Sequence, residues 1–145
     1  MIANIVKWFE KADPKPTAHK LNVAVGVHCE EVAEFIESLC GEDHASQDAI
    51  TNAHHVLGSL ADALKSGVCK VHVDDRQNCL KELTDQIVTA TGIATYAGMN
   101  MELALSRTIA SNWSKFDRNG NPIFKENGKI AKGPDYEPPN LGECV

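Results

Sequence analysis

The sequence predicts an all-α fold, a four- to five-helix bundle over about 1–111 followed by an irregular arm over about 112–145. Only 6% of residues are aromatic while 43% are apolar, which fits a core of Leu, Val, Ile and Ala better than a β-sandwich. Apolar residues recur at helical spacing through the first part, and Gly, Pro, Asn and Lys dominate the arm. Because 145 residues suffice for one core, we expect a single domain over 1–145.

The expected helix boundaries follow from chemical signals. Pro14 and Pro16 stop the first helix, Thr17 can cap the second, and Gly41 ends it. Asn119-Gly120 and Asn127-Gly128 are turn dipeptides, so we expect a small hairpin or ordered loop in the arm. The helices are expected at about 2–11, 17–40, 46–65, 74–96 and 101–111.

Each expected helix has an apolar stripe that we predict to face the core. In order along the chain, the stripes are Ile2, Ile5, Val6 and Phe9; Leu21, Val25, Val32, Phe35, Ile36 and Leu39; Ile50, Ala53, Leu57, Leu60, Ala61 and Leu64; and Leu80, Leu83, Ile87, Val88 and Ala94.

Composition and sequence patterns argue against several kinds of partner, structural site and location. The formal net charge of −6 argues against a nucleic-acid polymer, because phosphate backbones need a basic surface. Five scattered cysteines without a C-x-x-C pair form neither a zinc framework nor a disulfide scaffold. No run approaches a membrane span and no signal peptide is recognised. We expect a soluble, cytoplasmic protein without a membrane partner.

Two acidic clusters carry most of the chemical information. One contains Glu30, Glu31 and Glu34, and the other contains Glu82 and Asp85. Residues three or four apart share a helix face, so each cluster can direct carboxylates to one side. Two such helices side by side would gather charges that a divalent cation stabilises. The alternative is that these are ordinary solvated helix charges.

Carboxylates alone are hard oxygen ligands that suit Mg²⁺ or Mn²⁺. Such an ion neutralises phosphates and activates water, and a carboxylate can accept the proton of that water. Positive or polar complements to phosphate follow at the end of the last helix and in the arm: Asn112, Lys115, Lys125, Lys129 and Lys132. The alternative for Lys125 and Lys129 is a role in surface solubility.

Other candidate ligands are interpreted as structural. His54 and His55 are adjacent and diverge by about 100° on a helix, which argues against a shared metal. Trp113 and Phe116 are expected to anchor the arm, although Trp113 has the alternative of stacking on a base. A di-iron bundle usually needs Glu-x-x-His pairs, and neither acidic cluster forms one.

These motifs resemble the all-α nucleotide pyrophosphohydrolases of the MazG and phosphoribosyl-ATP pyrophosphohydrolase type, whose pattern is E-E-x-x-E and then E-x-x-D. Here residues 30–34 read E-E-V-A-E and residues 82–85 read E-L-T-D. The small residues of 85–98, the S-N-W-S-K of 111–115 and the Gly- and Pro-rich 120–139 also resemble phage and bacterial members. The resemblance covers about residues 19–141.

The resemblance implies hydrolysis of a (deoxy)nucleoside triphosphate to the monophosphate and pyrophosphate. It implies Mg²⁺, with Mn²⁺ as a substitute, and a homodimer or homotetramer in the cytoplasm, of the host if a phage encodes it. We assign the catalytic role to Glu30 and Glu31. The metal ligands would be Glu30, Glu31, Glu34, Glu82 and Asp85, and the substrate contacts Asn112, Lys115, Lys129 and Lys132.

Two alternatives remain. One is phosphoribosyl-ATP pyrophosphohydrolase activity. The C-terminal tail resembles that branch of the family less closely than it resembles the enzymes that act on the nucleotide pool. The other is a catalytically silent helical oligomer that binds nucleotides or a protein. The long spacer between Glu34 and Glu82 departs from many relatives, and it leaves base preference open.

Overall fold

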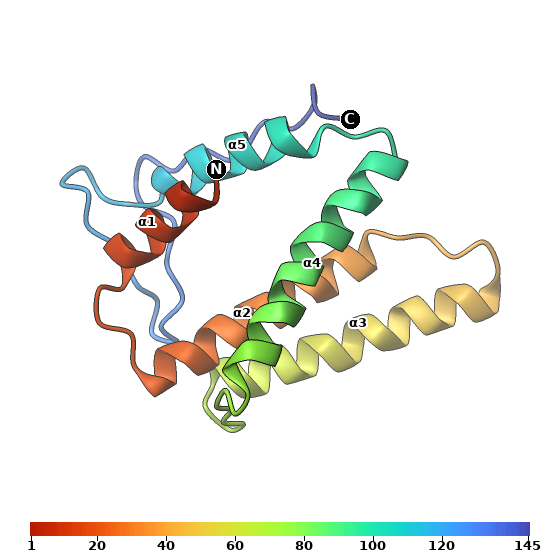
Figure 1. Cartoon of the computed structure of the whole chain (residues 1–145), viewed down its shortest axis with the longest axis horizontal. Coiled ribbons are helices and arrows are strands. Elements are labelled where there is room, and N and C mark those ends of the chain that lie inside the picture. The colour runs from red at the N-terminus through yellow and green to blue at the C-terminus, as the bar shows by residue number, and fades with distance from the viewer. The chain divides into compact units, whose positions relative to one another are not determined.

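A computed structural model describes all 145 residues and contains five α-helices and no strand (Figure 1). The all-α prediction is confirmed, and the helix boundaries differ from the expected ones by only a few residues. None of the helices is both long enough and apolar enough to span a membrane. The helices are α1 (Ile2–Ala12), α2 (Ala18–Glu37), α3 (His44–Lys65), α4 (Arg76–Tyr96) and α5 (Met101–Trp113).

Four of the five helices begin at a side-chain cap. The side-chain oxygens of Thr17, Asp43, Asp75 and Asn100 each accept a hydrogen bond from the backbone N–H three residues later, at 3.2, 2.7, 2.9 and 3.0 Å. Each cap satisfies an N–H group that the first helical turn leaves without an intrahelical partner. Short polar residues therefore fix where α2 to α5 start.

The chain forms two compact units, which are described separately. The first unit comprises 1–14, 73–123 and 130–145, and the second comprises 15–72 and 124–129. The first therefore holds α1, α4, α5 and most of the arm, while the second holds α2, α3 and the tip of the arm. The expectation of a single domain over 1–145 stays a prediction.

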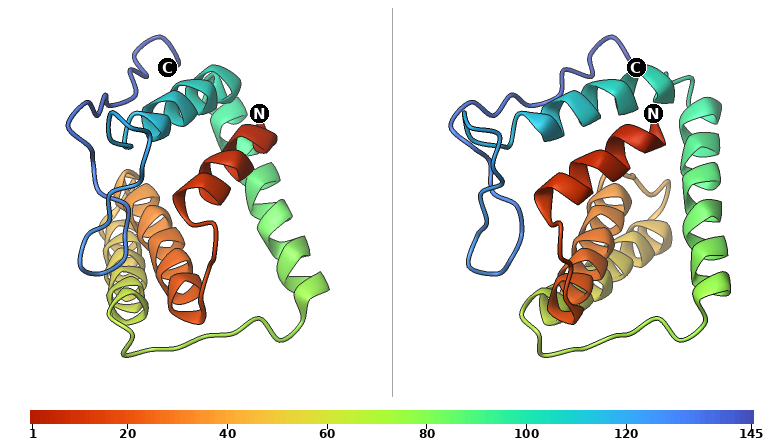
Figure 2. Two further views of the ribbon diagram at one scale, coloured as in Figure 1. Left: turned by 90° about the vertical axis from the view of Figure 1, so that its left-hand side faces the viewer. Right: turned by 60° about the vertical axis from the view of Figure 1, so that its left-hand side comes forward.

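In the second unit, α2 and α3 lie side by side and run in opposite directions (Figure 1 and Figure 2). Small residues allow this close packing: Gly26, Ala33 and Ala61 are buried at the contact, together with Leu64. A Cβ atom on Gly26 would lie 2.9 Å from the Ala61 carbonyl oxygen, which is closer than real contacts allow. The two backbones therefore approach each other where α2 lacks a side chain.

The predicted core stripe of α2 is partly wrong. Leu21, Phe35 and Leu39 are exposed, at 37%, 40% and 42%. The periodicity was correct for a helix, but α3 packs against the face that carries the small residues. On α3, Leu60 is likewise exposed at 43%, whereas the predicted core residues Ala61 and Leu64 are buried.

The first unit is held together by aromatic residues. Trp8 and Phe116 stack with their ring centroids 5.8 Å apart and their planes 5° from parallel. Ala12 completes this buried cluster, and Trp113 and Ile130 pack against it. Phe116 thus anchors the start of the arm, as predicted.

The predicted core face of α1 is wrong, because Ile2, Val6 and Phe9 are exposed at 53%, 48% and 56%. The buried face instead carries Trp8 and Ala12. The Trp8 indole N–H donates to the backbone carbonyl of Asn112 at 2.8 Å, which directs this face toward α5.

Helix α4 keeps most of its apolar stripe exposed. Within the first unit it meets only α5, at the end where the two helices connect (Figure 2). Of the predicted core residues of α4, only Ala94 is buried. The exposed fractions of Leu80, Leu83, Ile87 and Val88 are 63%, 45%, 52% and 68%.

The arm is ordered by turns and by α5. Gly128 has a φ of +78°, and its N–H donates to the Lys125 carbonyl in a tight turn, as the Asn-Gly dipeptide predicts. Farther along, Ser111 Oγ donates to the Glu137 carbonyl at 2.7 Å, and Arg107 pairs with Glu143. These contacts hold the tail along α5.

Candidate functional site

The three glutamates of the first acidic motif do not share one environment. Glu30 is half-buried and has hydrogen-bond partners from α3 and from the arm. Glu31 and Glu34 are exposed and form no ion pair. Because adjacent helical residues diverge by about 100°, Glu31 cannot follow Glu30 toward α3. Of the three predicted ligands on α2, Glu31 and Glu34 are thus open to solvent, and Glu30 is paired with lysine side chains.

Two ammonium groups bracket the Glu30 carboxylate. Lys65 Nζ lies 2.9 Å from Oε1 and Lys129 Nζ lies 2.5 Å from Oε2. Burial acts to raise the pKa of the Glu30 carboxyl, but the hydrogen bonds and charges of Lys129 and Lys65 outweigh it. The pKa of Glu30 therefore lies below its ordinary value, and the carboxylate is held in its charged form.

Lys65 is a site residue that the sequence reasoning missed. Only 11% of its side chain is exposed, and Nζ also pairs with Asp62 Oδ1 at 3.0 Å. Burial acts to lower the pKa of Lys65, but hydrogen bonds to Glu30 and Asp62 raise it overall. Its aliphatic stem lies against Gly26, one helical turn before Glu30. The signal in the sequence was a glycine four residues before a glutamate, because on a helix this spacing leaves room beside the carboxylate for a side chain such as that of Lys65.

The tip of the arm, residues 124–129, docks on α2. Lys20 Nζ lies 3.6 Å from the centroid of the Phe124 ring and also donates to the Gly128 carbonyl at 3.3 Å. A Cβ on Gly128 would lie 3.6 Å from Val23, an ordinary contact distance. This docking brings Lys129 to Glu30, so the structure unites a predicted substrate contact with a predicted metal ligand.

The second acidic motif lies on α4, in the first unit. Glu82 and Asp85 are exposed, and both accept hydrogen bonds from Lys81, at 3.0 and 2.9 Å. Hydrogen bonds to Asp85 and then to Glu82 raise the pKa of Lys81 above its ordinary value. No group of three or more His, Cys, Asp or Glu side chains gathers in a metal-ligating arrangement.

The serines of the S-N-W-S-K segment bind the arm. Ser111 and Ser114 are tied to the backbone of Glu137, whose N–H donates to Ser114 Oγ at 2.9 Å. Gly133 passes so close that a Cβ there would lie 2.6 Å from the Lys115 carbonyl oxygen. This segment therefore positions the tail beside the end of α5.

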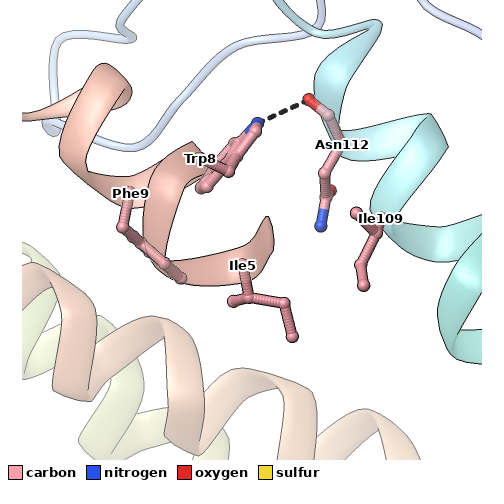
Figure 3. Close-up of a pocket in the computed structure, with 5 residues that line it drawn as sticks. All are labelled: Ile5, Trp8, Phe9, Ile109 and Asn112. Atoms are coloured by element: carbon pink, nitrogen blue, oxygen red, sulfur yellow. Dashed lines mark hydrogen bonds between the residues drawn. The ribbon is translucent and has the colours of Figure 1, made fainter. Parts of the chain in front are cut away.

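Asn112 lines a small pocket of the first unit (Figure 3). Its side-chain amide points into the pocket, whose volume of about 20 Å³ accommodates roughly one water molecule. Of the other predicted substrate contacts, Lys115 is half-buried, and Lys132 Nζ lies 4.7 Å from the centroid of the Tyr136 ring. The other pocket residues are Ile5, Trp8, Phe9 and Ile109.

Two side chains have the structural roles that the sequence suggests. His54 Nδ1 lies 3.1 Å from the Ala33 carbonyl, which accepts its hydrogen bond and links α3 to α2. Trp113 packs edge-to-face on Phe116 with a centroid separation of 5.5 Å.

Comparison with known proteins shows one clear structural likeness. A proposed NTP pyrophosphohydrolase from Exiguobacterium sp. 255-15 superposes with a TM-score of 0.60. The match covers 95% of this chain and 88% of that one, at 18% sequence identity. The two proteins share a fold. Neither a protein-family model nor a curated protein sequence matches the chain.

Proposed function

We propose that the protein is a Mg²⁺-dependent nucleoside triphosphate pyrophosphohydrolase. The supporting observation is that a chain with the E-E-x-x-E and E-x-x-D motifs has the fold of a proposed NTP pyrophosphohydrolase. In the reaction, the oxygen of water bonds to the α-phosphorus and the bond from that phosphorus to the bridging oxygen breaks. The products are a nucleoside monophosphate and pyrophosphate.

The carboxylates of each motif have the ligand chemistry that magnesium prefers. Glu31 and Glu34 offer unpaired, exposed carboxylates on α2, while Glu82 and Asp85 offer exposed carboxylates on α4 that share only Lys81. These carboxylates are hard oxygen donors, and Glu30 is a third candidate ligand on α2. When bound, Mg²⁺ neutralises phosphate charge and lowers the pKa of the attacking water.

The chain's own residues divide the remaining work. Glu31 is the better placed of the two proposed catalytic glutamates to accept the proton of water, because both oxygens of Glu30 are occupied by ammonium groups. Lys115, Lys129 and Lys132 would meet phosphate oxygens as point charges. Asn112 would contribute an amide donor to phosphate or sugar.

We also propose a homodimer or homotetramer. The exposed apolar residues of α4 support it, since contiguous exposed apolar surface commonly marks an interface. A second copy of the chain would remove Leu80, Leu83 and Ile87 from water.

The deciding experiment measures pyrophosphate release from a panel of nucleoside and deoxynucleoside triphosphates and phosphoribosyl-ATP, with and without Mg²⁺. We expect turnover of at least one triphosphate only with the metal. Glu31→Gln and Asp85→Asn should each reduce kcat by about 100-fold or more, because each removes a charged ligand or base without changing volume. Circular dichroism should show an unchanged helical content.

Glu10→Gln is the matched control, because Glu10 is an exposed glutamate of α1 outside both motifs. Its kcat should equal that of wild type. Full activity of Glu31→Gln would contradict the assigned site. Nucleotide binding without turnover of any compound would instead indicate the catalytically silent oligomer, and turnover of phosphoribosyl-ATP alone would indicate the other hydrolase.

A further inference from the structure

We propose that Lys65 and Lys129 form a lysine clamp on Glu30 with one fixed and one exchangeable member. Lys65 is a positioning residue that stays in place. Lys129 is an internal cation that occupies Glu30 until a divalent cation arrives with a polyphosphate, and it then transfers to a phosphate oxygen. This inference rests on the proposed function and adds how its site is kept ready.

Both oxygens of Glu30 accept hydrogen bonds from ammonium groups. One lies 2.9 Å from Lys65 Nζ and the other 2.5 Å from Lys129 Nζ. A metal ion at either oxygen would stand within a few ångströms of an ammonium group, where like charges repel strongly in a partly desolvated site. Metal binding to Glu30 therefore requires one ammonium to leave.

Lys65 is the member that stays. It extends from helix α3, and only 11% of its side chain is exposed. Its ammonium group pairs with both Glu30 and Asp62. Its stem fills the space above Gly26, where a Cβ would lie 2.9 Å from Lys65 Cγ. Moving this side chain would open a gap between α2 and α3 and leave a half-buried ammonium with fewer partners.

Lys129 is the member that can leave. Its side chain is 33% exposed, it comes from the arm rather than a helix, and Glu30 is its sole charged partner. The tip of the arm keeps two further attachments to Lys20, through Phe124 and the Gly128 carbonyl. The ammonium can therefore swing away while the backbone of the tip stays docked on α2.

The exchange conserves charge only if metal and polyphosphate arrive together. Metal alone would displace Lys129 into water without a new anion. A metal–polyphosphate complex instead brings oxygens that accept hydrogen bonds from the released ammonium. The clamp therefore favours the complex over the free cation, and weakens metal binding when nucleotide is absent.

The test titrates Mn²⁺ into nucleotide-free protein, followed by electron paramagnetic resonance of the free ion. Lys129→Met keeps the aliphatic stem but removes the charge, and should lower the metal Kd about three- to tenfold, the range of a partly exposed ion pair. Lys125→Met removes a charge from an exposed residue of the same arm tip and should change Kd less than about twofold. In a Glu30→Gln background, Lys129→Met should have no effect.

A second titration adds a nonhydrolysable triphosphate. The nucleotide should tighten Mn²⁺ binding more in wild type than in Lys129→Met, because only wild type has an ammonium to transfer. If wild type binds Mn²⁺ and Lys129→Met binds it with the same Kd as wild type, both in the absence and in the presence of the nucleotide, the clamp is overturned. The proposed function then stands. If neither binds Mn²⁺, the metal role of Glu30 and the clamp are both overturned.

Discussion

Glu30, Glu31 and Glu34 belong to one short motif, yet the fold gives them different partners. The sequence identified the carboxylates because their spacing is local. It could not identify the pairing of Glu30 with Lys65 and Lys129, which lie 35 and 99 positions away. Such pairings depend on how α2 meets α3 and the arm. The spacing of charges along one helix therefore proposes candidate ligands, but it does not reveal which side chains pair with them.

At this scale the lysine clamp predicts a pH dependence of stability. The pKa of Glu30 is lowered by folding, so its contribution is complete above the unfolded value, about 4.3, and is lost as pH falls through the folded value. Urea unfolding should show wild type about 1 kcal/mol more stable than Glu30→Gln at pH 7. The difference should shrink toward pH 3.

The clamp would be refuted as a stabilising feature if the two proteins unfolded at the same urea concentration at pH 7. A difference that grew on acidification would contradict the sign derived from the lowered pKa. Glu10→Gln serves as the control, with no change expected at either pH because Glu10 is exposed and lies outside the clamp.

Helix boundaries were predictable because short-range chemistry sets them. Thr17 is the N-cap of α2 as expected, and Gly41 follows its end. Packing faces were less predictable, since periodicity does not reveal which of two adjacent stripes will meet a neighbour. On α2 the face with the small residues Gly26 and Ala33 packs against α3, because small residues allow the closer approach. Leu21 and Phe35 stay exposed.

Gly26 tests this account of the α2–α3 contact. Alanine gains about 1 kcal/mol of helix propensity over glycine, but its Cβ would meet Ala61 O and Lys65 Cγ at 2.9 Å. Gly26→Ala should therefore destabilise the protein by about 1–3 kcal/mol in urea unfolding. Gly58→Ala, on α3 with nothing within 4 Å of its Cβ, should be neutral or stabilising. Equal stabilisation by both changes would contradict the close approach.

At the scale of the whole molecule, the all-α class followed from composition and periodicity. Burial did not, because most of the apolar residues that recur at helical spacing along α4 are exposed. Amphipathic periodicity predicts that the apolar face of a helix will be buried. It does not predict whether the same chain or a second chain buries that face. The proposed oligomer supplies a cover for residues such as Ile87 that a single chain does not bury.

Ile87→Lys tests the proposed oligomer, since it places a charge in the middle of the exposed apolar stripe of α4. Light scattering after size-exclusion chromatography should give an oligomeric mass for wild type and a smaller mass for the variant, at the same helical content. Thr89→Lys, an exposed position on another side of α4, should keep the wild-type mass. A monomeric wild type would end the oligomer proposal.

Both tryptophans of the chain, Trp8 and Trp113, sit around Phe116 in the first unit. The indole emission of this protein therefore reports on the first unit, whereas the lysine clamp lies in the second. Far-ultraviolet dichroism, by contrast, sums over every helix. Whether melting curves from the two methods coincide will reveal if the halves of the chain lose structure in one cooperative step.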